Sequence, residues 1–289
     1  MTAAQPDAAV REAAAGGAAT LRVAGIQMTA AASVEPNLQT AARLLEQARA
    51  AGAQLAVLPE FFCLLGRSDT DKVDAGEADG DGPIQRFLSE QARSLQLWLV
   101  GGSLPLKSSD FRRVYNASLA FAPDGRRVAR YDKIHLFGLN RPGEPAFDEA
   151  ATIVAGRTPV VFDLPAPTRR WRIGMSICYD VRFPEMYRVL SPVDLILVPS
   201  VFTYVTGRAH WETLLRARAI ENQCYVLAPA QGGRHENGRR SWGHSLLIDP
   251  WGEILSVLPE GEGVVVGDLD AARLDEVRSS LPALTHRTL

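Results

Sequence analysis

The chain has 289 residues, of which 46% are hydrophobic and 22% are charged, and its formal net charge is -2. These proportions are typical of a globular protein with a sizeable core, and the small net charge argues against nucleic acid or an anionic membrane as a partner. No apolar run approaches the roughly 20 residues that cross a bilayer, so we expect a soluble protein.

The first 20 residues are small and rich in alanine. They lack the basic start and apolar block of a secretory signal, which predicts a poorly ordered tail at 1–20 and one domain at 21–289. The three cysteines form an odd set without a CxxC pair, which argues against a disulfide framework or a zinc site and favours a reducing, cytoplasmic location. Cys63 and Cys224 have apolar neighbours of the kind that leave a thiol buried and inert, whereas Cys178 does not.

From residue 21 the chain alternates segments typical of strands and of helices. Helical spacing of apolar residues predicts helices at 36–51, 84–95 and 211–223, with a short helical piece at 184–190. Apolar runs predict strands at 21–29, 55–60, 97–103, 173–179, 195–200 and 225–231. This alternation indicates an α/β domain.

Two predicted hairpins resemble each other. The pattern Ser-Leu, then Pro, then Gly occurs at 118–125 and recurs with the same spacing at 245–252. Each pattern joins an apolar strand to a second strand through a P-D-G or P-W-G turn. Chance similarity is one interpretation. We favour two similar halves, stacked sheet on sheet with helices outside, because both hairpins close the same order of elements.

Cys178 is the candidate nucleophile. It ends an apolar segment, and Pro184 and Glu185 follow in positions that suit the first turn of a helix. A strand-to-helix turn holds a side chain out of the sheet and leaves backbone N–H groups free beside it. A nucleophile with an oxyanion hole requires both features.

A thiol with a pKa near ~8.5 needs a base. None of the five histidines stands in a recognisable Cys-His pattern, although His135 and His244 lie closer to strand ends than the others. Glu60 is a better candidate, because a carboxylate that terminates an apolar strand is costly unless it is paired or functional. Lys133 lies in a strand-like run and could stabilise an oxyanion. For Glu60 a surface strand end, and for Lys133 an edge-strand position, remain structural alternatives.

Three sequence blocks carry a family resemblance. LAVLPEFF at 55–62, YDKIHLF at 131–137 and ICYDVRFPE at 177–185 resemble, in this order, the signature blocks of the nitrilase superfamily of carbon–nitrogen hydrolases. The resemblance implies a four-layer αββα sandwich that pairs with a second copy, giving a homodimer or higher homo-oligomer. It also implies that no metal or organic cofactor is needed.

The resemblance assigns catalytic roles. It implies a triad of Glu60 as base, Lys133 as oxyanion partner and Cys178 as nucleophile, with the Tyr179 N–H sharing the oxyanion. It implies a second glutamate in the site, for which Glu149 is a better match than Glu144.

Within the superfamily, residues 207–255 look most like the deaminated glutathione amidase branch. That branch implies cleavage of a small carboxylate-bearing amide through a thioester, releasing 2-oxoglutarate and cysteinylglycine. Arg182 would clamp the substrate carboxylate, with an ion pair to Glu185 or Asp180 as the structural alternative. Phe202 and Thr206 would line the same pocket.

Other activities remain open. One is ω-amidase action on 2-oxoglutaramate or on a broader set of small amides, and another is a catalytically silent scaffold paralogue on the same fold. The chain also departs from its relatives at Arg208, where most have proline, and in a short link at Ser191-Pro192. These departures bear on the pocket and leave the triad intact.

Overall fold

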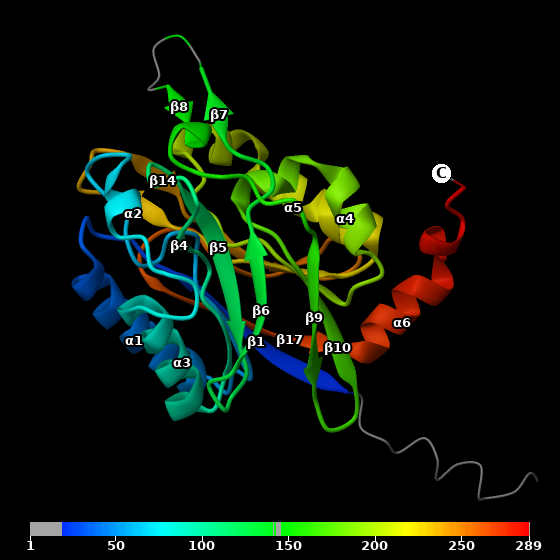
Figure 1. Ribbon diagram of the computed structural model, residues 1–289. Coiled ribbons are helices and arrows are strands. Elements are labelled where there is room, and N and C mark those ends of the chain that lie inside the picture. Colours follow the sequence, from blue (N-terminus) through cyan, green and yellow to red (C-terminus); the bar gives the residue numbers. More distant parts are fainter. Residues whose placement is uncertain (1–18, 141, 143–145, 289) are drawn as a thin grey trace, which may run out of the picture.

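The computed structural model describes residues 19–140, 142 and 146–288 (Figure 1). The predicted tail at 1–20 lies outside the described residues except for its last two, and Thr20 already belongs to the first strand. Glu144 also lies outside them. No helix in the described ranges is long and apolar enough to cross a membrane.

Two sheets dominate the described part of the chain. The first has the order β17-β1-β2-β3-β5-β4, with β6 paired to β5. Its strands are β1 (Thr20–Gln27), β2 (Leu55–Val57), β3 (Trp98–Val100), β4 (Leu104–Lys107), β5 (Val114–Phe121), β6 (Arg127–Asp132) and β17 (Gly263–Asp270). The second has the order β16-β15-β12-β11-β10-β9. Its strands are β9 (Val160–Pro165), β10 (Arg170–Met175), β11 (Leu195–Leu197), β12 (Tyr225–Ala228), β15 (Ser245–Ile248) and β16 (Ile254–Leu258).

Helices cover the outer faces of the two sheets (Figure 1). On the first sheet lie α1 (Val34–Ala50) and α3 (Pro83–Leu95), and on the second lie α4 (Pro184–Leu190) and α5 (Tyr204–Asn222). The remaining helices are α2 (Asp71–Asp74), α6 (Ala271–Ser280) and the 3-10 helices η3 (Glu149–Ala151), η4 (Cys178–Arg182) and η5 (Ala283–Thr285). Two short ribbons, β7 (Gly138–Leu139) with β8 (Phe147–Asp148) and β13 (Gly232–Arg234) with β14 (Arg240–Trp242), extend from this sandwich. The predicted αββα layering is confirmed.

Strand β1 illustrates why the layers form. Its side chains alternate, so that Leu21 and Val23 join the core between the sheets while Ala24 and Ile26 join the core beneath α1. Every second residue of a strand points to the same face, and a strand that is apolar on both faces must therefore be covered on both. Alternate residues of β2 divide between the two cores in the same way.

The two halves predicted from the hairpin pattern are confirmed by the sheet topology. In one half β1, β2 and β3 run parallel and β5 joins them antiparallel, followed by the hairpin to β6. In the other half β10, β11 and β12 run parallel and β15 joins antiparallel, followed by the hairpin to β16. The hairpin turns place Gly125 and Gly252 at φ +82 and +90, a region that favours glycine.

Some element boundaries differ from the predicted ones. The predicted strand 173–179 ends at Met175, because the chain turns there to open η4 at Cys178. Helix α5 begins at Tyr204, seven residues before the predicted start, where the Thr203 hydroxyl accepts from the Thr206 N–H and caps it. Helix α6 and several strands were not predicted, among them β17, although its sequence GVVVGDLD carries a run of three valines.

Candidate active site

Cys178 occupies a sharp turn between β10 and η4. Its φ is +48, a backbone conformation that side-chain-bearing residues adopt at a cost and that clusters at functional sites. The Cys178 N–H donates to the Pro199 carbonyl over 2.9 Å. No acceptor in the described part of the chain takes the N–H of the next residue, Tyr179. The turn therefore presents a thiol with a free backbone donor beside it.

Glu60 lies three residues beyond the end of β2 and is 1% exposed. Its Oε1 accepts from Lys133 Nζ and from Asn116 Nδ2, both over 2.9 Å, and its Oε2 accepts from the Val201 N–H over 2.8 Å. A buried carboxylate is tolerable only with such donors. The approach of Gly102 to the Pro59 carbonyl leaves no room for a Cβ, so a glycine is required to seat this segment.

Lys133 directly follows β6 and joins two glutamates. Its Nζ lies 2.9 Å from Glu60 Oε1 and 3.0 and 2.8 Å from the two carboxylate oxygens of Glu149. Glu149 begins η3 and also accepts from the Phe137 N–H over 2.7 Å. Lys133 is therefore a buried, doubly paired ammonium: it follows β6, which lies at an edge of its sheet, but it does not snorkel to solvent. The surface alternative is wrong for Glu60.

Asn116 on β5 was missed by the sequence reasoning. Its Nδ2 donates to Glu60 Oε1 over 2.9 Å and to Glu149 Oε1 over 3.2 Å. It is fully buried, and its backbone carbonyl accepts from the Lys133 N–H over 3.0 Å. The available signal was an amide side chain inside the apolar strand VYNASLAF. Asn116 Nδ2 thus donates to the same two carboxylate oxygens, Glu60 Oε1 and Glu149 Oε1, as Lys133 Nζ does.

The electrostatics of the site follow from its burial. Burial raises the pKa of the Cys178 thiol well above its ordinary value, the charge of Glu60 raises it further, and Lys133 opposes the shift. Burial alone would lower the pKa of Lys133, but Glu149 and Glu60 outweigh it and raise that pKa. The resting site therefore holds a neutral thiol, a charged ammonium and an acceptor carboxylate, so the thiol needs a base before it can attack.

Asp180 connects the turn that carries Cys178 to the segment that carries Lys133. Its Oδ2 accepts from the Tyr131 hydroxyl over 2.6 Å and from the Ile177 N–H over 2.9 Å. Its Oδ1 accepts from the His135 N–H over 3.0 Å and lies 2.8 Å from His135 Nδ1. Asp180 is fully buried, and it fixes the residues on either side of Lys133 relative to Cys178.

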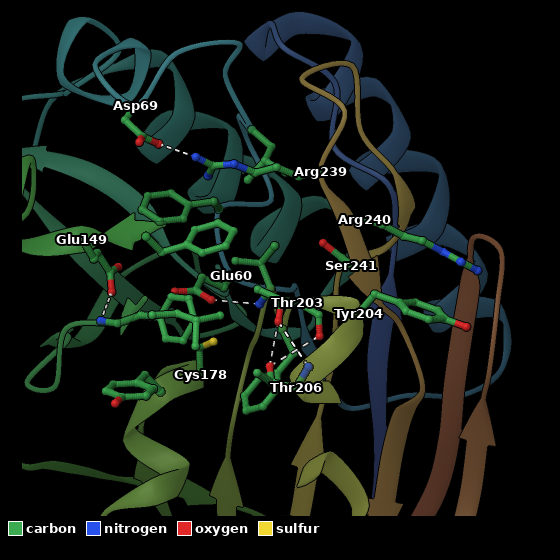
Figure 2. Close-up of a pocket in the computed structure, with 18 of the residues that line it drawn as sticks. Glu60, Asp69, Glu149, Cys178, Thr203, Tyr204, Thr206, Arg239, Arg240 and Ser241 are labelled. Carbon is green, nitrogen blue, oxygen red and sulfur yellow. Dashed lines mark hydrogen bonds and ion pairs between the residues drawn. The ribbon is translucent and has the colours of Figure 1, made fainter. Parts of the chain in front are cut away.

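A cavity of about 380 Å³ opens onto these groups (Figure 2). This volume suits a small organic ligand. Figure 2 shows Glu60 and Cys178 beside each other, with Thr203 and Thr206 at one side of the cavity and the Asp69–Arg239 pair at another. The site residues predicted from the sequence that line it are Glu60, Lys133, Glu149, Cys178, Tyr179, Phe202 and Thr206.

Arg182 is not among the residues that line this cavity. Its guanidinium lies over the rings of Tyr179 and Phe202, 5.8 and 5.4 Å from their centroids. Its Nη atoms are 3.3 and 3.4 Å from His210 Nδ1. The alternative ion pair with Glu185 or Asp180 does not form within the described residues either. Arg182 thus packs against two rings that line the cavity, those of Tyr179 and Phe202, without lining it itself.

The histidines are placed away from the thiol. None of the five lines the cavity that holds Cys178 in the described ranges. His135 pairs with Asp180, His235 is buried between the Ala30 carbonyl and the Ser241 hydroxyl, and His244 stacks on Trp242. A papain-like arrangement with a histidine base is therefore wrong for this site.

Comparisons with known proteins show the family of the chain. Residues 22–279 match the model of the carbon-nitrogen hydrolase family, and the chain belongs to that family. Over 268 residues it is 41% identical to a deaminated glutathione amidase of Synechocystis sp., covering 91% of this chain and 97% of that protein. It is 36% identical over 270 residues to the human deaminated glutathione amidase, covering 92% and 81%.

Solved structures give the same result. A Saccharomyces cerevisiae member of branch 10 of the nitrilase superfamily superposes with a TM-score of 0.83 at 29% identity, covering 93% of this chain and 97% of that one. A mutant amidase of Nesterenkonia sp., in which acrylamide has added to the active-site cysteine, gives a TM-score of 0.72 at 27% identity, covering 91% and 98%. The protein is thus a hydrolase of carbon–nitrogen bonds in amides.

Proposed function

We propose that this amidase hydrolyses deaminated glutathione, or a closely similar carboxylate-bearing amide, through a thioester on Cys178. The observation that carries the mechanism is the contact of one buried ammonium, Lys133, with both Glu60 and Glu149 in the cavity that Cys178 lines. This arrangement supplies a base, a nucleophile and an oxyanion partner within one enclosed space.

Acylation begins with the neutral thiol. Glu60 takes the proton from Cys178 Sγ as the sulfur bonds to the amide carbon, and the carbonyl π electrons move onto oxygen. Lys133 Nζ and the Tyr179 N–H stabilise that oxyanion. When the C–N bond breaks, the proton on Glu60 passes to the leaving amine, and the acyl group remains on sulfur as a thioester.

Deacylation uses the same carboxylate. Glu60 takes a proton from water as the water oxygen bonds to the thioester carbon. The intermediate then expels the Cys178 sulfur, which recovers the proton from Glu60. The net reaction consumes one amide and one water and releases one carboxylic acid and one amine. Glu149 acts by holding Lys133, since both of its oxygens contact that ammonium.

The substrate proposal rests on the cavity and on the named relatives. Deaminated glutathione carries carboxylates at both ends, and cationic side chains that the sequence reasoning missed line the cavity at Lys72, Arg239 and Arg240. Phe202 and Thr206 would contact the acyl half. The relatives named deaminated glutathione amidase at 36–41% identity support this choice over a neutral amide.

Turnover of synthetic deaminated glutathione against 2-oxoglutaramate tests the proposal. We expect the first to give the higher kcat/KM, because its cysteinylglycine half can contact more of the cavity wall. A higher kcat/KM for 2-oxoglutaramate would make the protein an ω-amidase. If the enzyme hydrolyses neither substrate, the assignment is refuted. If the protein hydrolyses no amide at all, the catalytically silent scaffold paralogue is favoured.

We also propose that the protein is a homo-oligomer that works in a reducing cytoplasm. Ile220 on α5, Trp251 and two residues of β16, Leu255 and Val257, are apolar side chains that are each about half exposed. Trp251, Leu255 and Val257 belong to the β15–β16 hairpin, whose turn contacts α5 through Arg216 Nε and the Gly252 carbonyl, and exposed apolar side chains grouped in this way are typical of an interface between subunits. Sedimentation should give a mass of at least twice 31.4 kDa, and charge substitutions at Leu255 and Val257 should lower it.

A further inference from the structure

Two cations in the cavity wall have no part in the reaction described above. Arg239, at the end of the turn that leads into β14, lies with its Nη2 2.7 Å from Asp69 Oδ1. Lys72 on α2 lies 3.9 Å from the same oxygen and donates to the Thr152 hydroxyl over 3.3 Å. All three charged side chains line the cavity. Two cations therefore share a single carboxylate, so that within this cluster the positive charges outnumber the negative by one.

The other N–H groups of Arg239 and Lys72 are available to bind a ligand. No other acceptor in the described part of the chain takes an N–H of the Arg239 guanidinium or of the Lys72 ammonium. Lys72 is largely buried, with 17% of its side chain exposed, and burial lowers its pKa. A buried ammonium with few partners is stabilised by an incoming anion.

The wall between Cys178 and Arg239 is aromatic. The Arg239 guanidinium lies 5.0 Å from the Phe147 ring, which is 5.5 Å from the Phe137 ring, which in turn is 5.2 Å from the ring of Tyr179. Tyr179 directly follows the nucleophile. Figure 2 shows the Asp69–Arg239 pair on the opposite side of the cavity from Thr206, which would contact the acyl half.

The segments that carry the two cations are held together. Asn237 Nδ2 donates to the Gly66 carbonyl over 2.7 Å, and Arg67 pairs with Glu236 over 3.1 Å. These contacts join the loop before α2 to the turn between β13 and β14. The cationic pair is therefore preorganised, which reduces the ordering cost of binding an anion.

We propose that Arg239 and Lys72, positioned by Asp69, form a leaving-group subsite that binds the terminal carboxylate of the amine half of the substrate. This inference rests on the proposed function and adds the recognition of the leaving group to it. A substrate whose leaving amine ends in a carboxylate would span the aromatic wall and complete an alternating cluster of two cations and two anions.

Binding separates this inference from the proposed activity. In a Cys178→Ala background, which cannot turn over, calorimetry would compare deaminated glutathione with its C-terminal amide, which differs only in the terminal charge. We expect the carboxylate form to bind at least about tenfold more tightly, as the loss of a charge-assisted pair predicts. Adding Arg239→Gln or Lys72→Gln should remove most of that preference.

Arg67→Gln is the matched control. Arg67 belongs to the same loop contact but does not line the cavity, so this variant should keep the preference. The subsite would be overturned if deaminated glutathione and its C-terminal amide bind equally tightly. It would also be overturned if the preference for the carboxylate form survives both Arg239→Gln and Lys72→Gln. An equal weakening of 2-oxoglutaramate binding by Arg239→Gln would also overturn it, because that amide carries only the acyl carboxylate. Preferential binding without turnover by the unsubstituted enzyme would refute the activity and leave the subsite standing.

Discussion

The Tyr131 hydroxyl donates to Asp180 Oδ2 over 2.6 Å, and this bond joins the strand that leads to Lys133 to the turn that carries Cys178. Asp180 also holds the Ile177 N–H next to the nucleophile. The relative position of ammonium and thiol therefore depends on one buried carboxylate that does not face the cavity.

Asp180→Asn should lower kcat more than it raises KM. The amide keeps the shape but turns one acceptor oxygen into a donor that faces the Tyr131 hydroxyl or the Ile177 N–H. We expect a loss of about 1–3 kcal/mol in stability and at least about tenfold in kcat. Tyr131→Phe removes one donor to Asp180 and the acceptor of the Ile134 N–H, but it leaves the other contacts of Asp180 in place, so it should cost less in kcat. Unchanged kcat in folded Asp180→Asn enzyme would contradict a positioning role.

Cys178 should be the essential thiol among the three. Cys178→Ala should abolish turnover and preserve the folded state, as judged by circular dichroism and thermal unfolding. Cys63 and Cys224 are fully buried, and burial raises the pKa of each thiol. Alanine there should cost at most a few kcal/mol of stability and should spare kcat. Appreciable turnover by Cys178→Ala would refute the thioester mechanism.

Glu60→Gln should change turnover and alkylation in opposite directions. The charge of Glu60 raises the pKa of Cys178, while Lys133 lowers it. Removal of the negative charge therefore lowers that pKa and increases the thiolate fraction at a given pH. We expect iodoacetamide to modify Cys178 faster at pH 7–8 in the variant, while amide hydrolysis falls by at least about a hundredfold. Slower alkylation in Glu60→Gln would mean that proton removal by Glu60, rather than its charge, governs the reactivity of the thiol.

The Arg182 carboxylate clamp inferred from the sequence stays a prediction. If it is right, Arg182→Lys raises KM strongly for an anionic amide and much less for a neutral amide of similar size. The stacking of Arg182 on Tyr179 and Phe202 favours a different result, a similar loss on both substrates, because a lysine cannot support the two rings in the same way. Parallel kinetics on the two amides distinguish these outcomes.

His235 should make stability depend on pH. Burial lowers its pKa, the Ala30 carbonyl opposes the shift, and Arg239 adds to it. Below the ordinary histidine pKa of about 6.5 the unfolded chain takes up the proton before the folded one, so stability is lost as pH falls from about 7 towards 5. His235→Gln should flatten this dependence in thermal unfolding. An equally steep curve in the variant would assign the effect to other groups.

The sequence by itself determined the α/β class, the two similar halves and the three residues that we propose as nucleophile, base and oxyanion partner. These features are local: alternating apolar residues specify strands, turn residues end them, a carboxylate and a thiol each follow an apolar strand, and an ammonium follows a strand-like run. Such patterns can be found without knowing what packs against what.

Only the tertiary structure decided which side chains meet. Asn116 is 56 residues from Glu60, and Asp69 is 170 residues from Arg239, so no local pattern links either pair. Strand order and the closure of two loops bring them into contact. Packing also decided where Arg182 lies: it follows Cys178 by four positions, and its guanidinium lies over the rings of Tyr179 and Phe202.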